Sequence, residues 1–188
     1  MPAGNVKIII DDVRHYLLVT DETYDMVISE PIDMWTENSN NLYTVEFYEL
    51  VKKHMGEDSI FAQWIPLYEL SPDDFKILVS TLSSVFPNIY IFKLSENELL
   101  AVATLKPLDT SKIKRKKVER NILRSLSKIN MAPDDIPSLY IGKAKYSYTV
   151  NTDDKPILEF RAVSYTHLRA HETSLHLVCP LHLVCRLL

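Results

Sequence analysis

Two carboxylates, Glu30 and Asp33, come directly after the apolar run Met26 to Ser29. Such a run is typical of a short buried β-strand, and Pro31 ends it because proline cannot continue the hydrogen-bond ladder of a sheet. In open α/β sheets, ligands bind in the crevice outside the carboxyl ends of the parallel strands. The two acids are therefore candidates for a binding or catalytic site.

A second strand end carries acids in the same way. The β-branched run Val6 to Ile10 stops at Asp11 and Asp12, and a short helix or turn over Val13 to Val19 follows. The sequence thus predicts a parallel strand, an acid, a crossover, a second strand and a second acid. The same carboxylates could instead be helix caps or turn formers, and the residue types leave both interpretations open.

The elements that must position these acids are indicated by the patterns that follow. The segment Ser71 to Asp74 is a clear helix start, with serine as N-cap, proline at the first position and acids in the first turn. The other predicted elements are a helix from Tyr43 to His54 ended by Gly56, a strand at Ser59 to Trp64, a helix face from Phe75 to Phe86, and strands at Ile89 to Lys93 and Leu99 to Leu105. This order predicts an α/β fold with a mostly parallel sheet that ends in an antiparallel hairpin.

Beyond Pro107 the composition changes. A basic amphipathic helix is predicted over Ser111 to Asn130, and its lysines favour a solvated face over a phosphate or membrane contact. A proline-broken loop is predicted at Met131 to Ser138. The block Asn151 to Phe160 (NTDDKPILEF) predicts a turn followed by a short strand, with a structural turn favoured over a substrate contact.

Composition excludes several classes of protein. The chain has 188 residues, and its net charge of −4 argues against a general nucleic-acid binder. It also has no apolar run long enough to span a membrane. The absence of a signal peptide predicts a cytoplasmic polypeptide. The three glycines, Gly4, Gly56 and Gly142, form no phosphate-binding loop.

Several stretches together resemble one family. YDMVISEP, LYTVEFYELVKKHM, FAQWIPLYELSPDDFKILVSTLSSVFP and NTDDKPILEFRA are similar to the spermidine synthase-like proteins, the polyamine aminopropyltransferases, and in particular to a bacterial branch often fused to a membrane domain. The resemblance covers about Val6 to Ala162. It implies that residues 1–106 are the C-terminal half of a Rossmann-like S-adenosylmethionine-dependent transferase domain and that residues 107–162 are a helical extension.

The resemblance also implies an activity and a set of site residues. The family moves an aminopropyl group from decarboxylated S-adenosylmethionine, a co-substrate and not a tightly bound cofactor, to a polyamine such as putrescine. Glu30 would deprotonate or orient the attacking amine, Asp33 and Gln63 would bind the polyamine, and Asp12 with the neighbouring Val13 would contact the adenine. The chemistry fits, because an alkyl amine with a pKa of about 10 must lose a proton before it attacks carbon.

Two departures from the family pattern stand out. Synthases of this family typically have aspartate at the position of Glu30, so the carboxylate here is displaced by about one methylene. The first half of the domain, with its glycine-rich loop, is also missing from the chain. We therefore expect this polypeptide alone to be inactive and not to bind the nucleoside, and the exposed sheet edge to promote self-association, including a homo-oligomer.

The tail, residues 163–188, needs a separate explanation. VSYTHLRAHET resembles the translation of a sequencing adapter, so the tail is predicted to be non-native and disordered. The alternative is a metal site made by His167, His171, Cys179 and Cys185. The adapter interpretation is favoured, and the sequence predicts no metal site.

Two further functions remain open from the sequence. One is a methyltransferase that acts on a small molecule, because acidic strand ends favour a cationic acceptor without specifying the group that is transferred. The other is a non-catalytic module that senses polyamines or regulates an attached membrane domain.

Overall fold

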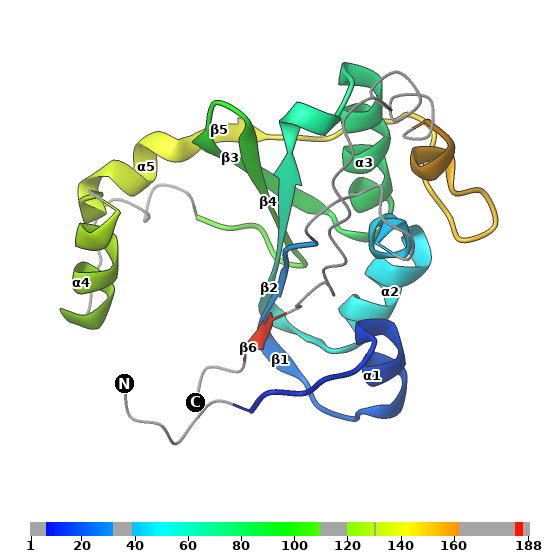
Figure 1. The fold of residues 1–188 in the computed structure, drawn as a ribbon, viewed down its shortest axis with the longest axis horizontal. Helices are drawn as coiled ribbons and strands as arrows, with labels where there is room; N and C mark the ends of the chain where they lie inside the picture. The colour runs from blue at the N-terminus through cyan, green and yellow to red at the C-terminus, as the bar shows by residue number, and fades with distance from the viewer. Residues whose placement is uncertain (1–6, 32–38, 110–119, 130, 162–182, 186–188) are drawn as a thin grey trace, which may run out of the picture.

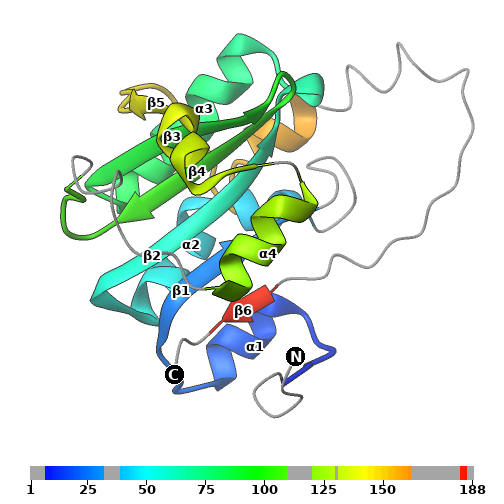
Figure 2. The ribbon, with the colours of Figure 1, turned by 90° about the vertical axis from the view of Figure 1, so that its left-hand side faces the viewer.

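A computed structural model describes residues 7–31, 39–109, 120–129, 131–161 and 183–185 of the chain. Its described strands form a six-stranded sheet in the order β5-β3-β4-β2-β1-β6. The strands are β1 Tyr24–Ser29, β2 Met55–Pro66, β3 Asn88–Ser95, β4 Glu98–Thr104, β5 Tyr140–Lys143 and β6 Leu183–Cys185. Figure 2 shows this order across the face of the sheet.

Among the described strands, only β1 and β2 pair in parallel, with Val27 opposite Phe61 and Ser29 opposite Gln63. The other four pairings, β2–β4, β3–β4, β3–β5 and β1–β6, are antiparallel. The predicted α/β class and the β3–β4 hairpin are confirmed. The sheet has fewer parallel pairs than predicted for two reasons. The run before Asp11 does not join it, and β4 lies between β2 and β3 and is antiparallel to both.

Three helices cover one face of the sheet, while α4 (Arg120–Lys128) lies on the opposite side (Figures 1 and 2). These three are α1 Val13–Val19, α2 Val45–Lys53 and α3 Pro72–Val85. Helix α2 begins after Thr44, whose hydroxyl accepts a hydrogen bond from the amide of Phe47. Helix α3 begins with the predicted cap: the Ser71 hydroxyl accepts from the Asp74 amide, and the Asp74 carboxylate accepts from the Ser71 amide.

The core lies between α2, α3 and the centre of the sheet, and aromatic rings dominate it. Phe47, Tyr48, Phe61 and Phe86 are all buried, and the rings of Phe61 and Phe86 stack with centroids 5.7 Å apart. Each large apolar side chain contributes roughly 1.5–3 kcal/mol when it is fully buried. This cluster therefore fixes α2 over the carboxyl half of β2.

The strand predicted over Val6 to Ile10 is wrong for its described residues, 7–10, which form no regular element. Ile8 is 79% exposed and Ile10 is 94% exposed. A β-branched run becomes a strand only when a neighbouring strand pairs with its backbone. Both edges of β1 are occupied, by β2 and β6, and this run pairs with none of the described strands.

Other predicted boundaries also change. Helix α2 ends at Lys53 with His54 as its C-cap, and β2 begins at Met55, so Gly56 lies in a strand and does not end the helix. The hydrogen bonds of each element decide these limits, and the His54 amide donates to Val51 O. The described part of the predicted basic helix is α4, whereas residues 110–119 and 130 lie outside the described residues.

Two segments predicted as loop and strand are helical. In place of the proline-broken loop, the structure has two short helical turns, Pro133–Asp135 and Ile136–Leu139 (α5). Each has a proline in its first turn, where the missing amide costs no hydrogen bond. Residues 157–161 form a helical turn and not a strand. The amide of Phe160 donates to Pro156 O, and no neighbouring strand pairs with this segment.

The last described strand, β6, comes from the tail. It pairs antiparallel with β1, with Met26 opposite Cys185 and Ile28 opposite Leu183. Residues 162–182 and 186–188, and with them three of the four metal ligands considered for the tail, lie outside the described residues. The adapter origin of the tail stays a prediction.

Candidate functional site

Glu30 lies at the carboxyl end of β1, directly after Ser29, and its side chain is exposed. Because β1 and β2 are parallel and Ser29 lies opposite Gln63, both strands end at the same edge of the sheet. The structure therefore presents one accessible carboxylate at the edge where α/β sheets bind ligands. The second predicted acid of this loop, Asp33, lies outside the described residues.

Asp12 has a structural contact of its own. It is the N-cap of α1, and its carboxylate accepts a hydrogen bond of 2.9 Å from the amide of His15. The neighbouring Asp11 contacts the ring Nδ1 of His15 at 2.9 Å, and this hydrogen bond lowers the pKa of Asp11. The helix-cap interpretation of Asp12 is thus realised, while its carboxylate stays exposed and its adenine contact stays a prediction.

The first turn of α1 contacts the segment before α2. Arg14, in its first turn, donates a 2.8 Å hydrogen bond to Asn41 O and a 3.4 Å bond to the hydroxyl of Thr44, the N-cap of α2. The segment that contains Asn41 and Thr44 follows β1 in the chain. These contacts hold Asp12 and Val13 beside the segment that returns from the end of β1, and Val13 packs partly buried against the core.

Gln63 is fully buried, at 0% exposed, in contrast to the exposed acids. Its side-chain oxygen accepts a hydrogen bond of 2.6 Å from the hydroxyl of Tyr48 on α2. Among the described residues, neither Gln63 Nε2 nor the buried hydroxyl of Ser29 has a hydrogen-bond partner. Gln63, which was predicted to line the substrate site, is therefore buried beneath α2 and not exposed at the end of the strands.

Tyr48 and Ser29 are residues that the sequence did not single out. Burial raises the pKa of Tyr48 well above its ordinary value, and the charge of Tyr43 adds to this effect, so the phenol stays protonated and can donate to Gln63. The apolar spacing of α2 indicated that its inner face is buried. It could not indicate that one tyrosine on that face contacts the strand.

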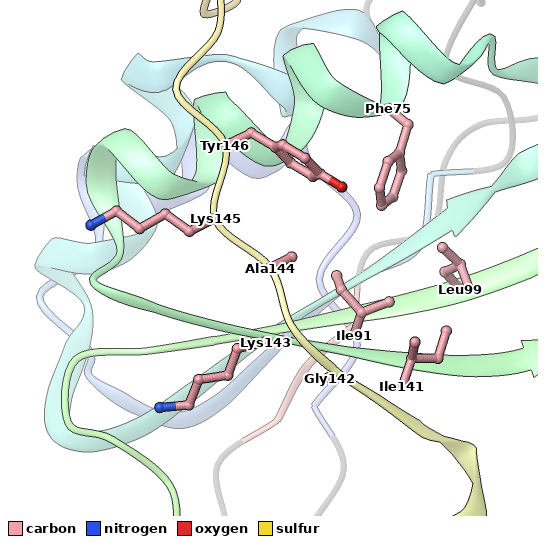
Figure 3. Close-up of a pocket in the computed structure, with 9 residues that line it drawn as sticks. All are labelled: Phe75, Ile91, Leu99, Ile141, Gly142, Lys143, Ala144, Lys145 and Tyr146. Carbon is pink, nitrogen blue, oxygen red and sulfur yellow. The ribbon is translucent and has the colours of Figure 1, made fainter.

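A pocket of about 420 Å³ lies apart from these residues, between α3, the strands β3 to β5 and the segment after β5 (Figure 3). Its walls are mostly apolar, with Phe75 and Tyr146 in edge-to-face contact at 6.3 Å and with Ile91 and Leu99 below them. The side chains of Lys143 and Lys145 point away from its centre (Figure 3). None of the acids at the end of β1 lines this pocket.

The predicted turn in the NTDDKP motif is confirmed. Thr152 and Lys155 exchange backbone hydrogen bonds of 3.3 and 3.2 Å across Asp153 and Asp154. The side chain of Asn151, which is fully buried, donates to Tyr43 O and accepts from the amide of Leu158. The motif therefore joins its own helical turn to the segment before α2.

Two absences hold for the described part of the chain. It contains no cluster of three or more histidine, cysteine, aspartate or glutamate side chains arranged to hold a metal ion. Within the same residues, no helix has the length and apolar character needed to cross a bilayer.

Comparisons with known proteins place these features in context. The model of the spermine/spermidine synthase domain family matches residues 3–95. Polyamine aminopropyltransferase 2 of Aquifex aeolicus (strain VF5) is 38% identical over 56 residues, which are 30% of this chain and 11% of that protein. The matched family segment contains Glu30, Asp33, Gln63, Asp12 and Val13.

One solved structure supports the same overall fold. A spermidine synthase in complex with the transition state analogue AdoDATO is similar with a TM-score of 0.54 and 17% identity, covering 72% of this chain and 47% of that one. The spermidine synthase of Thermotoga maritima is similar with a TM-score of 0.48 and 19% identity, covering 70% and 45%. The chain thus spans less than half of each of these structures and about a tenth of the curated relative.

Proposed function

We propose, from the premise that residues 3–95 belong to the spermine/spermidine synthase domain family, that this chain carries the amine-activating part of a polyamine aminopropyltransferase. The observation that carries the proposal is the exposed Glu30 carboxylate at the carboxyl end of β1, inside the matched segment. The donor would be decarboxylated S-adenosylmethionine and the acceptor a polyamine such as putrescine.

The proposed reaction needs a base and good alignment. Glu30 accepts a proton from the ammonium group, which has a pKa of about 10 in water, and leaves the amine nitrogen with a free electron pair. That nitrogen forms a bond to the aminopropyl methylene that is attached to the sulfonium sulfur, while the bond between this carbon and the sulfur breaks. The sulfur takes the bonding electrons and leaves as the neutral thioether methylthioadenosine, so proximity and orientation supply much of the remaining rate.

The other site residues have supporting roles in this proposal. Asp33 would hold the distal ammonium group of the polyamine, and Asp12 with Val13 would contact the adenine at the start of α1. Gln63 would line the acceptor side from beneath α2, held there by Tyr48. Because Gln63 is completely buried, a direct contact with the polyamine is disfavoured in this arrangement. Gln63 would instead act through a neighbouring group or after a side-chain movement.

We further propose that the chain by itself does not bind the nucleoside. Its three glycines stand far apart in the sequence, at positions 4, 56 and 142, and make up no glycine-rich motif of the kind that nucleotide sites use. A calorimetric titration of this chain with methylthioadenosine should give no binding heat. Micromolar affinity would contradict this part of the proposal.

A turnover assay tests the function itself. This chain and any longer product of the same reading frame are incubated with putrescine and either decarboxylated S-adenosylmethionine or S-adenosylmethionine, and products are identified by mass spectrometry. We expect spermidine from the decarboxylated donor with the longer product alone. Methylated amine from S-adenosylmethionine would contradict the proposal.

Substitution of the base makes the assay specific. Glu30→Gln should lower kcat about 10²–10⁴-fold, because general base catalysis contributes on that scale. Asp154→Asn is the matched control, because it removes the same charge from an exposed residue that is distant from Glu30 in the sequence. Equal activity of Glu30→Gln and the control would refute the role of Glu30.

A further inference from the structure

Residues 151–161, which contain the NTDDKP turn, contact two helices that are distant from them in sequence, α2 and α3. The backbone amide of Asn151 donates to the Thr81 hydroxyl on α3 at 2.9 Å, and Asn151 O accepts from the amide of Val45 at the start of α2. The Arg161 guanidinium forms an ion pair with the buried Asp74 carboxylate of α3. Figure 1 shows this segment beside α2 and α3, on the helix-covered side of the sheet.

A charged pair extends these connections to α1. Arg14 Nη1 and Nη2 donate to the two oxygens of Asp153 at 2.9 and 2.5 Å, so the guanidinium and the carboxylate meet in a two-pronged contact. The same Nη1 also donates to Asn41 O at 2.8 Å. One guanidinium therefore joins the first turn of α1, the segment before α2 and the NTDDKP turn.

The pair is favourable in its partly buried setting. The side chain of Arg14 is 23% exposed and that of Asp153 is 37% exposed. Burial alone would raise the pKa of Asp153, but the hydrogen bonds from Arg14 and Thr44 outweigh it and lower that pKa. The hydrogen bond to Asp153 raises the pKa of Arg14 in turn.

We propose that Arg14 and Asp153 are positioning residues that fix the first turn of α1, and with it Asp12 and Val13, against the segment before α2. This inference rests on the proposed function for its consequence, because Asp12 is the residue proposed to contact the nucleoside. In this proposal the NTDDKP turn serves the site through Arg14, to which both carboxylate oxygens of Asp153 are bound.

The location of the pair explains why it would act on binding more than on chemistry. Arg14 lies two residues after Asp12, whereas Glu30 lies at the end of β1. Groups that hold a contacting residue in place set the geometry of that contact, and a displacement of about 1 Å weakens it substantially. Loss of the pair should therefore weaken nucleoside binding and leave the base at Glu30 in place.

The neighbouring acid gives a matched control. Asp154 is exposed, and the structure assigns it no ion pair with any of the residues described. Asp153→Asn and Asp154→Asn remove the same charge from adjacent positions of one turn. Any difference between the two variants reports the contact with Arg14 and not the net charge.

Amide hydrogen exchange followed by NMR on the full chain tests the positioning role without requiring activity. In Asp153→Asn, the amides of His15 and Phe47, which are bonded to the caps of α1 and α2, should exchange roughly two- to fivefold faster, the scale expected when one partly exposed ion pair is lost. Amides of α3 and β4 should keep their wild-type rates. Asp154→Asn should match wild type throughout.

Arg14→Lys provides a second variant in case Asp153→Asn unfolds. Lysine keeps the charge but cannot make the two-pronged contact, so the faster exchange should appear at the same amides with a smaller increase. Wild-type rates at His15 and Phe47 in both variants would overturn the proposal. A uniform increase that includes α3 and β4 would overturn it as well, because the pair would then stabilise the whole fold.

Kinetics separate this proposal from the proposed function. In a longer product of the same reading frame that shows turnover, Asp153→Asn should raise KM for decarboxylated S-adenosylmethionine at least several-fold and leave kcat nearly unchanged. Glu30→Gln, in contrast, should lower kcat. A fall in kcat with unchanged KM would contradict the positioning role. Absence of turnover in every protein would refute the proposed function, while the exchange experiment would still decide the role of the pair.

Discussion

The hydrogen bond between Tyr48 and Gln63 leads to a quantitative prediction for Tyr48→Phe. Both side chains are 0% exposed, so water cannot replace the missing hydroxyl. The phenylalanine ring would keep the contacts that Tyr48 makes with Phe61 and Phe86, at centroid distances of 5.7 and 6.5 Å. The substitution therefore removes one hydrogen bond and little packing.

The expected cost follows from the groups left behind. Gln63 Oε1 loses its 2.6 Å partner, and Gln63 Nε2 already lacks one among the described residues. Because an unsatisfied buried polar group costs about 1–3 kcal/mol, we expect the free energy of unfolding to fall by about 2 kcal/mol. For a chain of this size that corresponds to a decrease in Tm of roughly 4–8 °C.

Urea unfolding followed by circular dichroism measures this change, with Tyr148→Phe as a control because Tyr148 is 52% exposed. A double-mutant cycle with Gln63→Leu sharpens the test. Replacing both partners with apolar groups leaves no broken hydrogen bond, so the double variant should be more stable than the sum of the single effects by about 1–2 kcal/mol.

Two results would refute this reasoning. A loss below about 0.5 kcal/mol in Tyr48→Phe would mean that the buried amide finds another partner or that the hydrogen bond contributes nothing. Strict additivity in the cycle would mean that Tyr48 and Gln63 do not interact. In either case Gln63 would not be held in place by α2.

Two more predictions concern the NTDDKP segment. Asn151→Ala should lower the free energy of unfolding by about 2–3 kcal/mol in urea, because it leaves Tyr43 O and the amide of Leu158 without their buried side-chain partner; a loss under about 0.5 kcal/mol would contradict this structural role. The pKa of Asp153 lies below its ordinary value of 3.8, so the contribution of its ion pair is fully present above that pH and is lost as the pH falls through the lowered pKa. The stability difference between wild type and Asp153→Asn should therefore be about 0.5–1 kcal/mol at neutral pH and vanish in acid, as measured by urea unfolding from pH 7 to pH 2; a difference that persists in acid would contradict the ion pair.

The parts of the fold that the sequence predicts well are those fixed by neighbouring residues. The cap of α3 needs four consecutive residues, Ser71 to Asp74, and it forms as predicted. The hairpin between β3 and β4 likewise depends on one short turn. The run before Asp11 has the composition of a strand, yet residues 7–10 form none, because a strand depends on a neighbour that composition does not reveal.

The candidate site divides in the same way. Glu30 at the end of β1 follows from an apolar run and a proline, which are local signals. The contact between Arg14 and Asp153 joins residues 139 positions apart, and the contact between Tyr48 and Gln63 joins a helix to a strand. Such pairs arise from tertiary packing, so the position of Gln63 under α2 could not be read from the residue types.

The most direct measurement is an isothermal titration of the chain with putrescine, comparing wild type with Glu30→Gln and the charge-matched Asp154→Asn. The proposed function predicts that wild type and Asp154→Asn bind with the same affinity and that Glu30→Gln binds at least several-fold more weakly, because the carboxylate at the end of β1 holds the ammonium group. Equal affinity for all three proteins, or no binding by any of them, would contradict it.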